Sequence, residues 1–480
     1  MALYRSKKTI AVGLHWLALC VAVPACVAPG LSKFEFDPAL LLALVVLMYC
    51  GTRLSILAAY GLNKAVELMF WLYCYTFFGI SAFLQIAENK FPWPGQYSSI
   101  SLFRGELIVL IGLIAFDMAR PINPKTKLLY RPIHKPNFEI SRARLYIVSA
   151  IGIMLMIYAT YTLGGLETLI LNRTALSSFI SQRYNLSTSL ILTVFAKTVV
   201  YVLLVIALAL RLRSHKRTLP LSILIFVLGL STALENNPVS TARFQVGTIL
   251  LSIFFVLPWQ RKFAWMTVYG MIMIMIVVFP YADLFRSSTN LNIVETIAHR
   301  ESKENQLITK PDYDSYQQVV NGVRFVQQNG FQFGRQISGA FLFWVPRSMW
   351  SGKPIPTGQL IAEKMGYGFT NLSAPLWIEF FVDGGWLLLI VGFYGYGRMV
   401  RWLDHIRMQN ARKITFVYLF ATIYAGYQFF LLRGSLMPAV AYLSPVIPII
   451  LCCVKLKRSR MRVLSVGSKD AGFEEVHEKC

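Results

Sequence analysis

The stretch SLILTVFAKTVVYVLLVIALAL, residues 189–210, decides the fold class. It holds a single charged residue, Lys197, and is as long as the roughly 20 residues that an apolar helix needs to cross a bilayer. Similar runs recur along the chain, in which 56% of the 480 residues are hydrophobic and only 15% are charged. A soluble protein of this length carries more charge and interrupts its apolar runs more often. The sequence therefore predicts an all-α, polytopic integral membrane protein.

The apolar runs predict about twelve transmembrane helices. Two of them, 38–52 and 244–258, are short for a bilayer and need help from neighbouring helices. The first run lacks a convincing small-residue cleavage site, so we expect it to remain as a helix rather than be removed as a signal peptide. The pattern shows no internal repeat and no broken helix. The predicted spans are residues 9–29, 38–52, 65–88, 101–119, 143–163, 189–210, 218–234, 244–258, 263–284, 373–397, 414–432 and 437–454.

The basic residues predict the orientation of these spans. Most of the 47 Lys and Arg residues fall in short clusters on one side of the predicted membrane, such as residues 120–144 and 398–413. Because cytoplasmic loops carry the excess of Lys and Arg, both termini are expected to be cytoplasmic. The net charge of +24 therefore reflects membrane topology, and no nucleic-acid partner is expected. The lipid bilayer is the first predicted partner.

The predicted topology divides the chain into four parts. Residues 1–284 hold nine helices, 285–372 form one large outer loop, 373–462 hold three more helices, and 463–480 form a cytoplasmic tail. Within the outer loop, the apolar run Gly339–Pro346 is too short to span. It is expected to be an interfacial or re-entrant segment that ends at its proline.

The seven cysteines and the acidic residues indicate neither a disulfide framework nor a metal site. The cysteines lie in apolar segments, at their ends or at the last residue, and none is in a predicted outer loop. No Cys–His spacing resembles a zinc site. We therefore expect no metal and no cofactor.

Three arginines lie at the outer ends of apolar segments, where few cations are expected. They are Arg243, Arg347 and Arg433. A guanidinium at such a place is costly unless an anion meets it, and its planar fork suits phosphate. Arg243 ends a short turn that also carries Glu235 and an Asn-Pro pair, so this turn is either an anion clamp or a capping turn with a local ion pair.

The run Pro346–Pro354 places two cations, Arg347 and Lys353, beside Trp350 in a stretch bounded by prolines. It is predicted to be a rigid, positively charged element. The alternative is that the cations reach toward lipid head groups and the tryptophan belongs to an interfacial belt.

Acidic and titratable residues on the outer side supply candidate bases. Glu379 and Asp383 are four residues apart and thus on one helix face, and carboxylates within a membrane are candidate site residues. An internal salt bridge to one of the arginines is the alternative. His299 lies in the outer loop and can titrate near neutrality, although a lone loop histidine is usually only solvated.

These motifs together resemble the bacterial oligosaccharide repeat-unit polymerases of O-antigen and capsule synthesis. The resemblance rests on the turn Asn237-Pro238…Arg243-Phe244, the run from Phe343 to Pro354 with Gly358, and Glu379…Gly384-Gly385-Trp386. It covers residues 230–400 by motif and the whole chain by topology.

The resemblance implies an enzyme at the outer leaflet of the bacterial inner membrane. Such an enzyme transfers a growing glycan from undecaprenyl diphosphate to a new lipid-linked repeat unit, and a chain-length regulator is a further expected partner. Arginines suit the diphosphate leaving group, and a carboxylate suits the acceptor hydroxyl. The candidate catalytic residues are Arg243, Arg347, Glu235, Glu379, Asp383 and His299, and the candidate substrate-binding residues are Arg433, Lys353, Trp350, Tyr313 and Tyr316.

Two other functions fit the same sequence. An O-antigen ligase uses the same lipid-linked donor and differs only in the acceptor. A transporter or flippase for lipid-linked sugars belongs to another class, and its inverted repeats and broken helices are not evident here.

Overall fold

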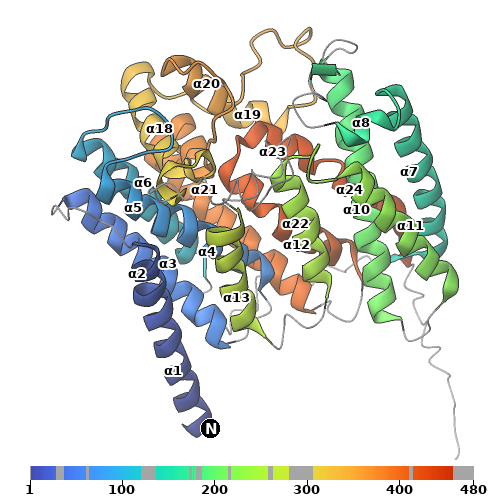
Figure 1. Ribbon diagram of the computed structural model, residues 1–480, viewed down its shortest axis with the longest axis horizontal. Coiled ribbons are helices and arrows are strands. Elements are labelled where there is room, and N and C mark those ends of the chain that lie inside the picture. The colour runs from blue at the N-terminus through green and yellow to red at the C-terminus, as the bar shows by residue number, and fades with distance from the viewer. Residues whose placement is uncertain are drawn as a thin grey trace, which may run out of the picture.

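The computed structural model describes residues 2–28, 37–60, 64–120, 137–171, 176, 178–179, 186–214, 218–257, 263–279, 306–409 and 414–457. Helix accounts for 79% of it, and the described residues hold one pair of short strands, so the fold class is all-α (Figure 1). Nine helices in this part of the chain are long and apolar enough to cross a membrane, and three more apolar helices are shorter. All twelve lie at predicted span positions.

The elements are as follows. The first half of the chain forms α1 (Ala2–Leu17), η1 (Ala18–Ala22), α2 (Val23–Val27), α3 (Pro38–Tyr60), α4 (Ala65–Tyr73), η2 (Cys74–Ser81), α5 (Ala82–Glu88), α6 (Ser99–Met118), β1 (Asn137–Ile140), α7 (Arg142–Thr162), α8 (Glu167–Ile170), α10 (Leu186–Arg213) and α11 (Leu219–Glu235). The second half forms α12 (Arg243–Val256), α13 (Ala264–Met273), η5 (Ile274–Val278), α17 (Gln306–Thr309), η6 (Pro311–Tyr313), α18 (Ser315–Asn329), α19 (Arg335–Phe341), α20 (Thr357–Lys364), α21 (Leu376–Gln409), α22 (Phe416–Arg433), α23 (Leu436–Leu443), α24 (Val446–Cys453) and β2 (Val454–Lys457).

Two expectations about individual helices are wrong. The second span does not end at residue 52, because Arg53 pairs with Asp117 of α6 and the charge is accommodated within a helix that continues to Tyr60. The absence of broken helices is also wrong. Helix α21 is kinked at Gly384 and Gly385, and the last span consists of α23 and α24. A lack of broken helices therefore no longer argues against a transporter.

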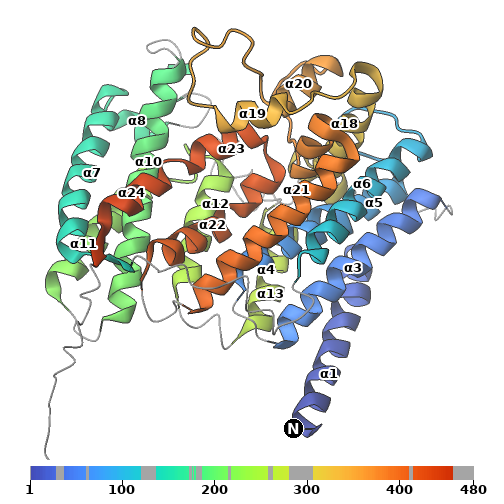
Figure 2. The same cartoon turned by 180° about the vertical axis from the view of Figure 1, so that it is seen from behind.

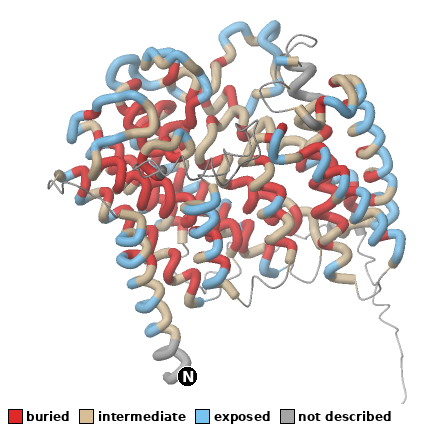
Figure 3. The backbone as a smooth tube through the Cα atoms, viewed as in Figure 1, coloured by how far each residue is buried: buried red, intermediate tan, exposed pale blue. Residues whose placement is uncertain are grey.

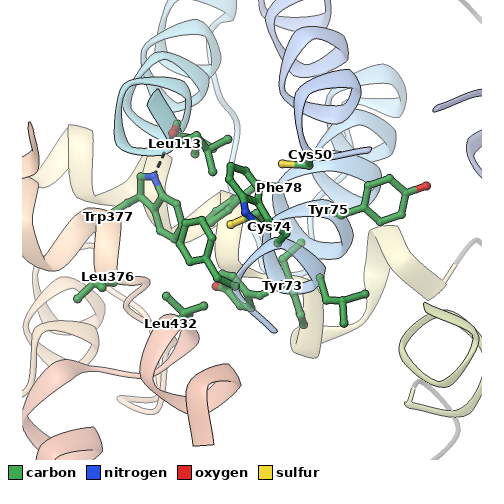
Figure 4. Close-up of a cluster of buried hydrophobic side chains, with 14 of the residues drawn as sticks. Cys50, Tyr73, Cys74, Tyr75, Phe78, Leu113, Leu376, Trp377 and Leu432 are labelled. Atoms are coloured by element: carbon green, nitrogen blue, oxygen red, sulfur yellow. Dashed lines mark hydrogen bonds between the residues drawn. The ribbon is translucent and has the colours of Figure 1, made fainter. Parts of the chain in front are cut away.

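The most buried of the nine long helices is the run α4–η2–α5, which is buried along nearly all of its length (Figure 3). Figure 4 shows side chains of this run, such as Tyr73 and Phe78, packed with residues from α3, α6, α21 and α22. The indole of Trp377 donates a hydrogen bond to the carbonyl of Val109 at 3.0 Å, which ties α21 to α6. A rigid core thus supports the helices that carry the candidate site.

The strands and the helices α18 to α20 lie toward opposite ends of the molecule's long helices. Strand β1 precedes α7 and pairs antiparallel with β2, which follows α24, so these two segments share one side of the helices. The start of α1 projects from the lower edge in Figure 1, whereas α18, α19 and α20 cover the upper edge. The described part of the segment predicted as the large outer loop, residues 306–372, therefore caps one end of the helices.

Candidate functional site

Helices α12 and α22 bring two of the predicted arginines together. Gly426 permits close packing, since a Cβ atom there would lie 2.7 Å from the carbonyl oxygen of Thr248. Near the start of α12 and the end of α22, the rings of Phe244 and Phe430 stack with centroids 3.8 Å apart. Arg243, the first residue of α12, directly precedes Phe244, and Arg433, the last residue of α22, lies three residues after Phe430.

Both arginines bind the short segment 311–314. Arg243 Nη1 lies 2.7 Å from Asp312 Oδ2. Arg433 donates from Nε to the Asp312 carbonyl at 3.0 Å and from Nη2 to Asp314 Oδ1 at 2.9 Å. Guanidinium groups from two distant parts of the chain therefore meet over one turn, and each is paired with a carboxylate.

We call Arg243, Arg433, Asp312 and Asp314 the arginine cluster. Its two carboxylates differ in burial and in the number of donors that they bind. Asp314 is buried and also accepts hydrogen bonds from Ser373 Oγ at 2.7 Å and Trp93 Nε1 at 2.9 Å. Sequence reasoning missed these acids as the partners of the arginines. The available signal was a pair of acids, two residues apart, in the segment predicted to cover the outer ends of the spans.

Arg347 and Lys353 do not join the arginine cluster. Arg347 is exposed, and within the described residues its hydrogen bonds reach only the carbonyls of Lys353 at 2.8 Å and Pro354 at 3.2 Å. Lys353 Nζ donates to the carbonyls of Phe343 and Val345 at 2.6 and 2.9 Å. Partial burial, with a smaller effect of Arg347, lowers the pKa of Lys353. The two cations thus stiffen their own loop, in which Trp350 is half-buried.

Glu379 and Asp383 are buried acceptors on α21. Glu379 accepts from Thr357 Oγ1 at 2.6 Å and from the Leu436 amide at 2.7 Å, joining α20, α21 and α23. Asp383 accepts from the amides of Gln336 and Ile337 at 3.0 and 2.7 Å, so it caps the first turn of α19. Neither carboxylate contacts an arginine within the described residues. Both instead hold the neighbouring helices α19, α20 and α23 against α21.

Two further candidates, Tyr313 and Tyr316, are not placed to stack on a sugar at the arginine cluster. Tyr313 and Tyr316 are buried, and their hydroxyls donate to the carbonyls of Met275 at 2.5 Å and Leu102 at 2.8 Å. Burial raises the pKa of both tyrosines. Neither ring is therefore available for stacking on a sugar in this conformation. His299 lies outside the described residues.

Glu235 lies in a pocket of its own beside the arginine cluster. It is buried, and its Oε1 is 2.5 Å from Thr160 Oγ1. Lys197, from the neighbouring helix α10, lines the same pocket. Glu235 is thus the candidate base that combines a carboxylate with an adjoining cavity.

Comparisons with family models, curated proteins and solved structures found no significant match for this chain. Among the described residues, no group of three or more His, Cys, Asp or Glu side chains is arranged to hold a metal ion. The function therefore has to be argued from the residues themselves.

Proposed function

We propose that this chain is a glycosyltransferase of the bacterial inner membrane that polymerises undecaprenyl-diphosphate-linked oligosaccharide repeat units at the outer leaflet. The observation that carries the proposal is the meeting of Arg243 and Arg433 over one turn. In this proposal the nine long and three short apolar helices form twelve spans, with both termini in the cytoplasm. The arginine cluster then faces outward, at the depth of a lipid diphosphate.

The proposed reaction uses the cluster to bind the leaving group. The hydroxyl oxygen of the acceptor sugar bonds to the anomeric carbon of the donor glycan, and the bond from that carbon to the diphosphate oxygen breaks. The hydroxyl proton passes to a carboxylate, and undecaprenyl diphosphate departs. Guanidinium groups stabilise the negative charge that develops on the leaving oxygen.

The carboxylates of the cluster neutralise its two guanidinium groups. A guanidinium in a partly dehydrated site is costly if it is left without a counter-charge. A carboxylate of the protein supplies that counter-charge until the diphosphate of the substrate replaces it. Asp312 is bound through one side-chain ion pair, whereas Asp314 is held by three donors. We infer that a diphosphate displaces Asp312 from Arg243, whereas Asp314 remains paired with Arg433.

A charge-neutralising cycle at Arg243 and Asp312 tests the proposal. The variants are Arg243→Gln, Asp312→Asn and the double variant, each assayed in vesicles with lipid-linked repeat units by the length of the product on gels. Removing a positioned cation is expected to lower the rate roughly 100-fold. Asp312→Asn should stay active, because the guanidinium remains.

The double variant separates the two roles of Arg243. If the arginine binds diphosphate, the double variant stays as inactive as Arg243→Gln. If the arginine only neutralises Asp312, removing both charges restores activity, and that result would contradict the proposal.

Two further measurements separate the polymerase from its rivals. In a strain without the chain, single repeat units on the core oligosaccharide indicate a lost polymerase, whereas polymer left on the carrier indicates a lost ligase. Conversion of lipid-linked repeats to longer chains by the purified protein, without an energy source, is not expected of a transporter. Adding a chain-length regulator should narrow the length distribution of the product.

A further inference from the structure

Basic residues gather where three segments of the chain meet, in the part of the molecule where α7, α10 and α24 pack together (Figure 1). The segments are the start of α7, the end of α10 and the pair of strands β1 and β2. Residues 137–147, 208–214 and 451–457 carry six cations and one acid, Glu139. We call the six cations the basic corner, and they are Arg142, Arg144, Arg211, Arg213, Lys455 and Lys457.

Hydrogen bonds made by the corner hold its three segments together. Arg142 Nη2 donates to Ser214 Oγ at 2.8 Å, which joins the start of α7 to the residue after α10. The guanidinium of Arg144 donates to the carbonyl of Val454, which joins α7 to the first residue of β2. Cations that are far apart in the sequence therefore share one surface of the folded chain.

The basic corner carries more positive charge than the nearby acid can neutralise. Arg142, Arg144 and Lys455 are exposed, and Arg211 is half-buried. Within the part of the chain that the structure describes, none of these four cations forms a salt bridge with a carboxylate. Glu139 lies opposite Lys455 in the strand pair and is the one acid of the three segments.

A second basic group, on α3, α6 and α21, is neutralised by the protein itself. There Asp117 forms ion pairs with Arg53, Arg120 and Arg401. The chain therefore provides carboxylates for one group of cations and leaves the basic corner with an excess. An anion from outside the chain can supply the counter-charge that the corner lacks.

The surface next to the corner is apolar, which indicates an anion that carries hydrocarbon. Ile147, Ile151 and Met154 are exposed on α7, and their spacing from Arg144 places all four residues on one helix face. A phospholipid with an anionic head group fits both features, because guanidinium groups bind phosphate oxygens and the apolar face accepts an acyl chain. A free phosphate ion would leave this face uncovered.

We propose that the basic corner binds the head group of an anionic phospholipid, with an acyl chain along the exposed face of α7. Arg142 and Lys455 are the exposed cations that α7 and β2 contribute to this site. The proposal does not depend on the proposed function. The alternative is that these cations are only solvated and serve to orient the helices in the membrane. This alternative predicts no preference among phospholipids.

The test titrates the purified full chain in detergent with phosphatidylglycerol or with phosphatidylcholine that has the same acyl chains. Native mass spectrometry measures the affinity for each lipid, and soluble glycerol phosphate is added as a competitor. The variants are Arg142→Gln, Lys455→Gln and the double variant. Arg398→Gln is the matched control, because it makes the same change at a half-buried arginine of α21, outside the basic corner.

We expect the wild type to prefer phosphatidylglycerol, and each single variant to weaken that binding by roughly fivefold. The double variant should lose roughly 25-fold, while Arg398→Gln binds as the wild type does. All variants should keep the wild-type elution volume, because the exchanged side chains are exposed or half-buried.

Three results would overturn the proposal. The first is equal affinity of the wild type for the two lipids, and the second is a double variant that keeps the wild-type affinity for phosphatidylglycerol. The third is displacement of the lipid by an equal concentration of glycerol phosphate, which would show a site for free phosphate rather than for a lipid. None of these results would change the case for the polymerase, because the corner contains no residue of the arginine cluster.

Discussion

Asp312 and Asp314 are two residues apart and each pairs with an arginine, yet they belong to different environments. Asp312 has a side chain that is 16% exposed and one side-chain partner, Arg243. Asp314 is 1% exposed and accepts hydrogen bonds from Arg433, Ser373 and Trp93. Breaking a buried pair leaves an uncompensated charge, whereas a partly exposed pair contributes little.

This difference predicts unequal effects on stability. Asp314→Ala should destabilise the protein by about 3–5 kcal/mol, because it removes the carboxylate that neutralises Arg433 and leaves Ser373 and Trp93 without their acceptor. Asp312→Ala should cost about 1 kcal/mol or less. The measurement is thermal unfolding of the purified variants in one detergent. Equal melting temperatures would show that Asp314 does not hold the segment as described.

At the scale of the element, helix α21 fixes the positions of α19, α20 and α23 through hydrogen bonds. Its buried acids Glu379 and Asp383 bind α20, α23 and the first turn of α19, and the helix then bends at Gly384 and Gly385. Gly385 has φ +60°, which L-residues with a Cβ rarely adopt. Below the bend, the helix runs on to the opposite edge of the molecule (Figure 2).

The bend predicts that two glycines of α21 respond in opposite directions to alanine. Gly385→Ala should destabilise by about 1–2 kcal/mol, because of the positive φ and because its Cβ would lie 3.1 Å from Phe331. Gly395→Ala should be neutral or stabilise by up to ~1 kcal/mol, since this helical glycine has open space around it. The measurements are the melting temperature and the expression level of the two variants. A Gly385→Ala variant as stable as the wild type would contradict a bend that requires the positive φ.

The sequence predicted the positions of the helices better than the contacts between them. Apolar runs are local signals, so the positions of the helices were readable, although the ion pair of Arg53 with Asp117 hid the true end of α3. The broken helix α21 could not be recognised, because a glycine pair favours close packing as well as a bend.

The partners of the candidate site depend on contacts between distant residues. Arg243 and Asp312 are separated by 69 positions, and Arg433 and the Asp312 carbonyl by 121. Nothing in the sequence near Arg347 distinguished a cation that binds its own loop from one that joins a cluster. The position of Arg243 and Arg433 at helix ends was readable, whereas Arg347 lies in the loop after α19. The grouping of the first two arginines was not readable.

At the scale of the whole molecule, charge is distributed unequally between the two ends of the helices. One end holds a group of ion pairs in which Asp117 binds Arg53, Arg120 and Arg401, and Glu67 binds Arg120 and Lys64. Strand β2 adds Lys455 and Lys457 to this side, and its partner β1 adds Glu139. The other end holds the arginine cluster and the elements α17 to α20. Cytoplasmic ends of membrane proteins carry the excess of cations, so the first end is expected to face the cytoplasm.

This orientation predicts the sidedness of single cysteines placed in a chain whose native cysteines have been replaced. Ser348→Cys, in the exposed loop after α19, should react in intact cells with a maleimide that does not cross the membrane. Lys455→Cys, exposed on β2, should react only after the cells are permeabilised. Both sites are accessible, so permeabilised cells supply the control for reactivity. The reverse pattern would place the arginine cluster in the cytoplasm, where an outer-leaflet glycan cannot reach it, and the proposed polymerase would fail together with the topology.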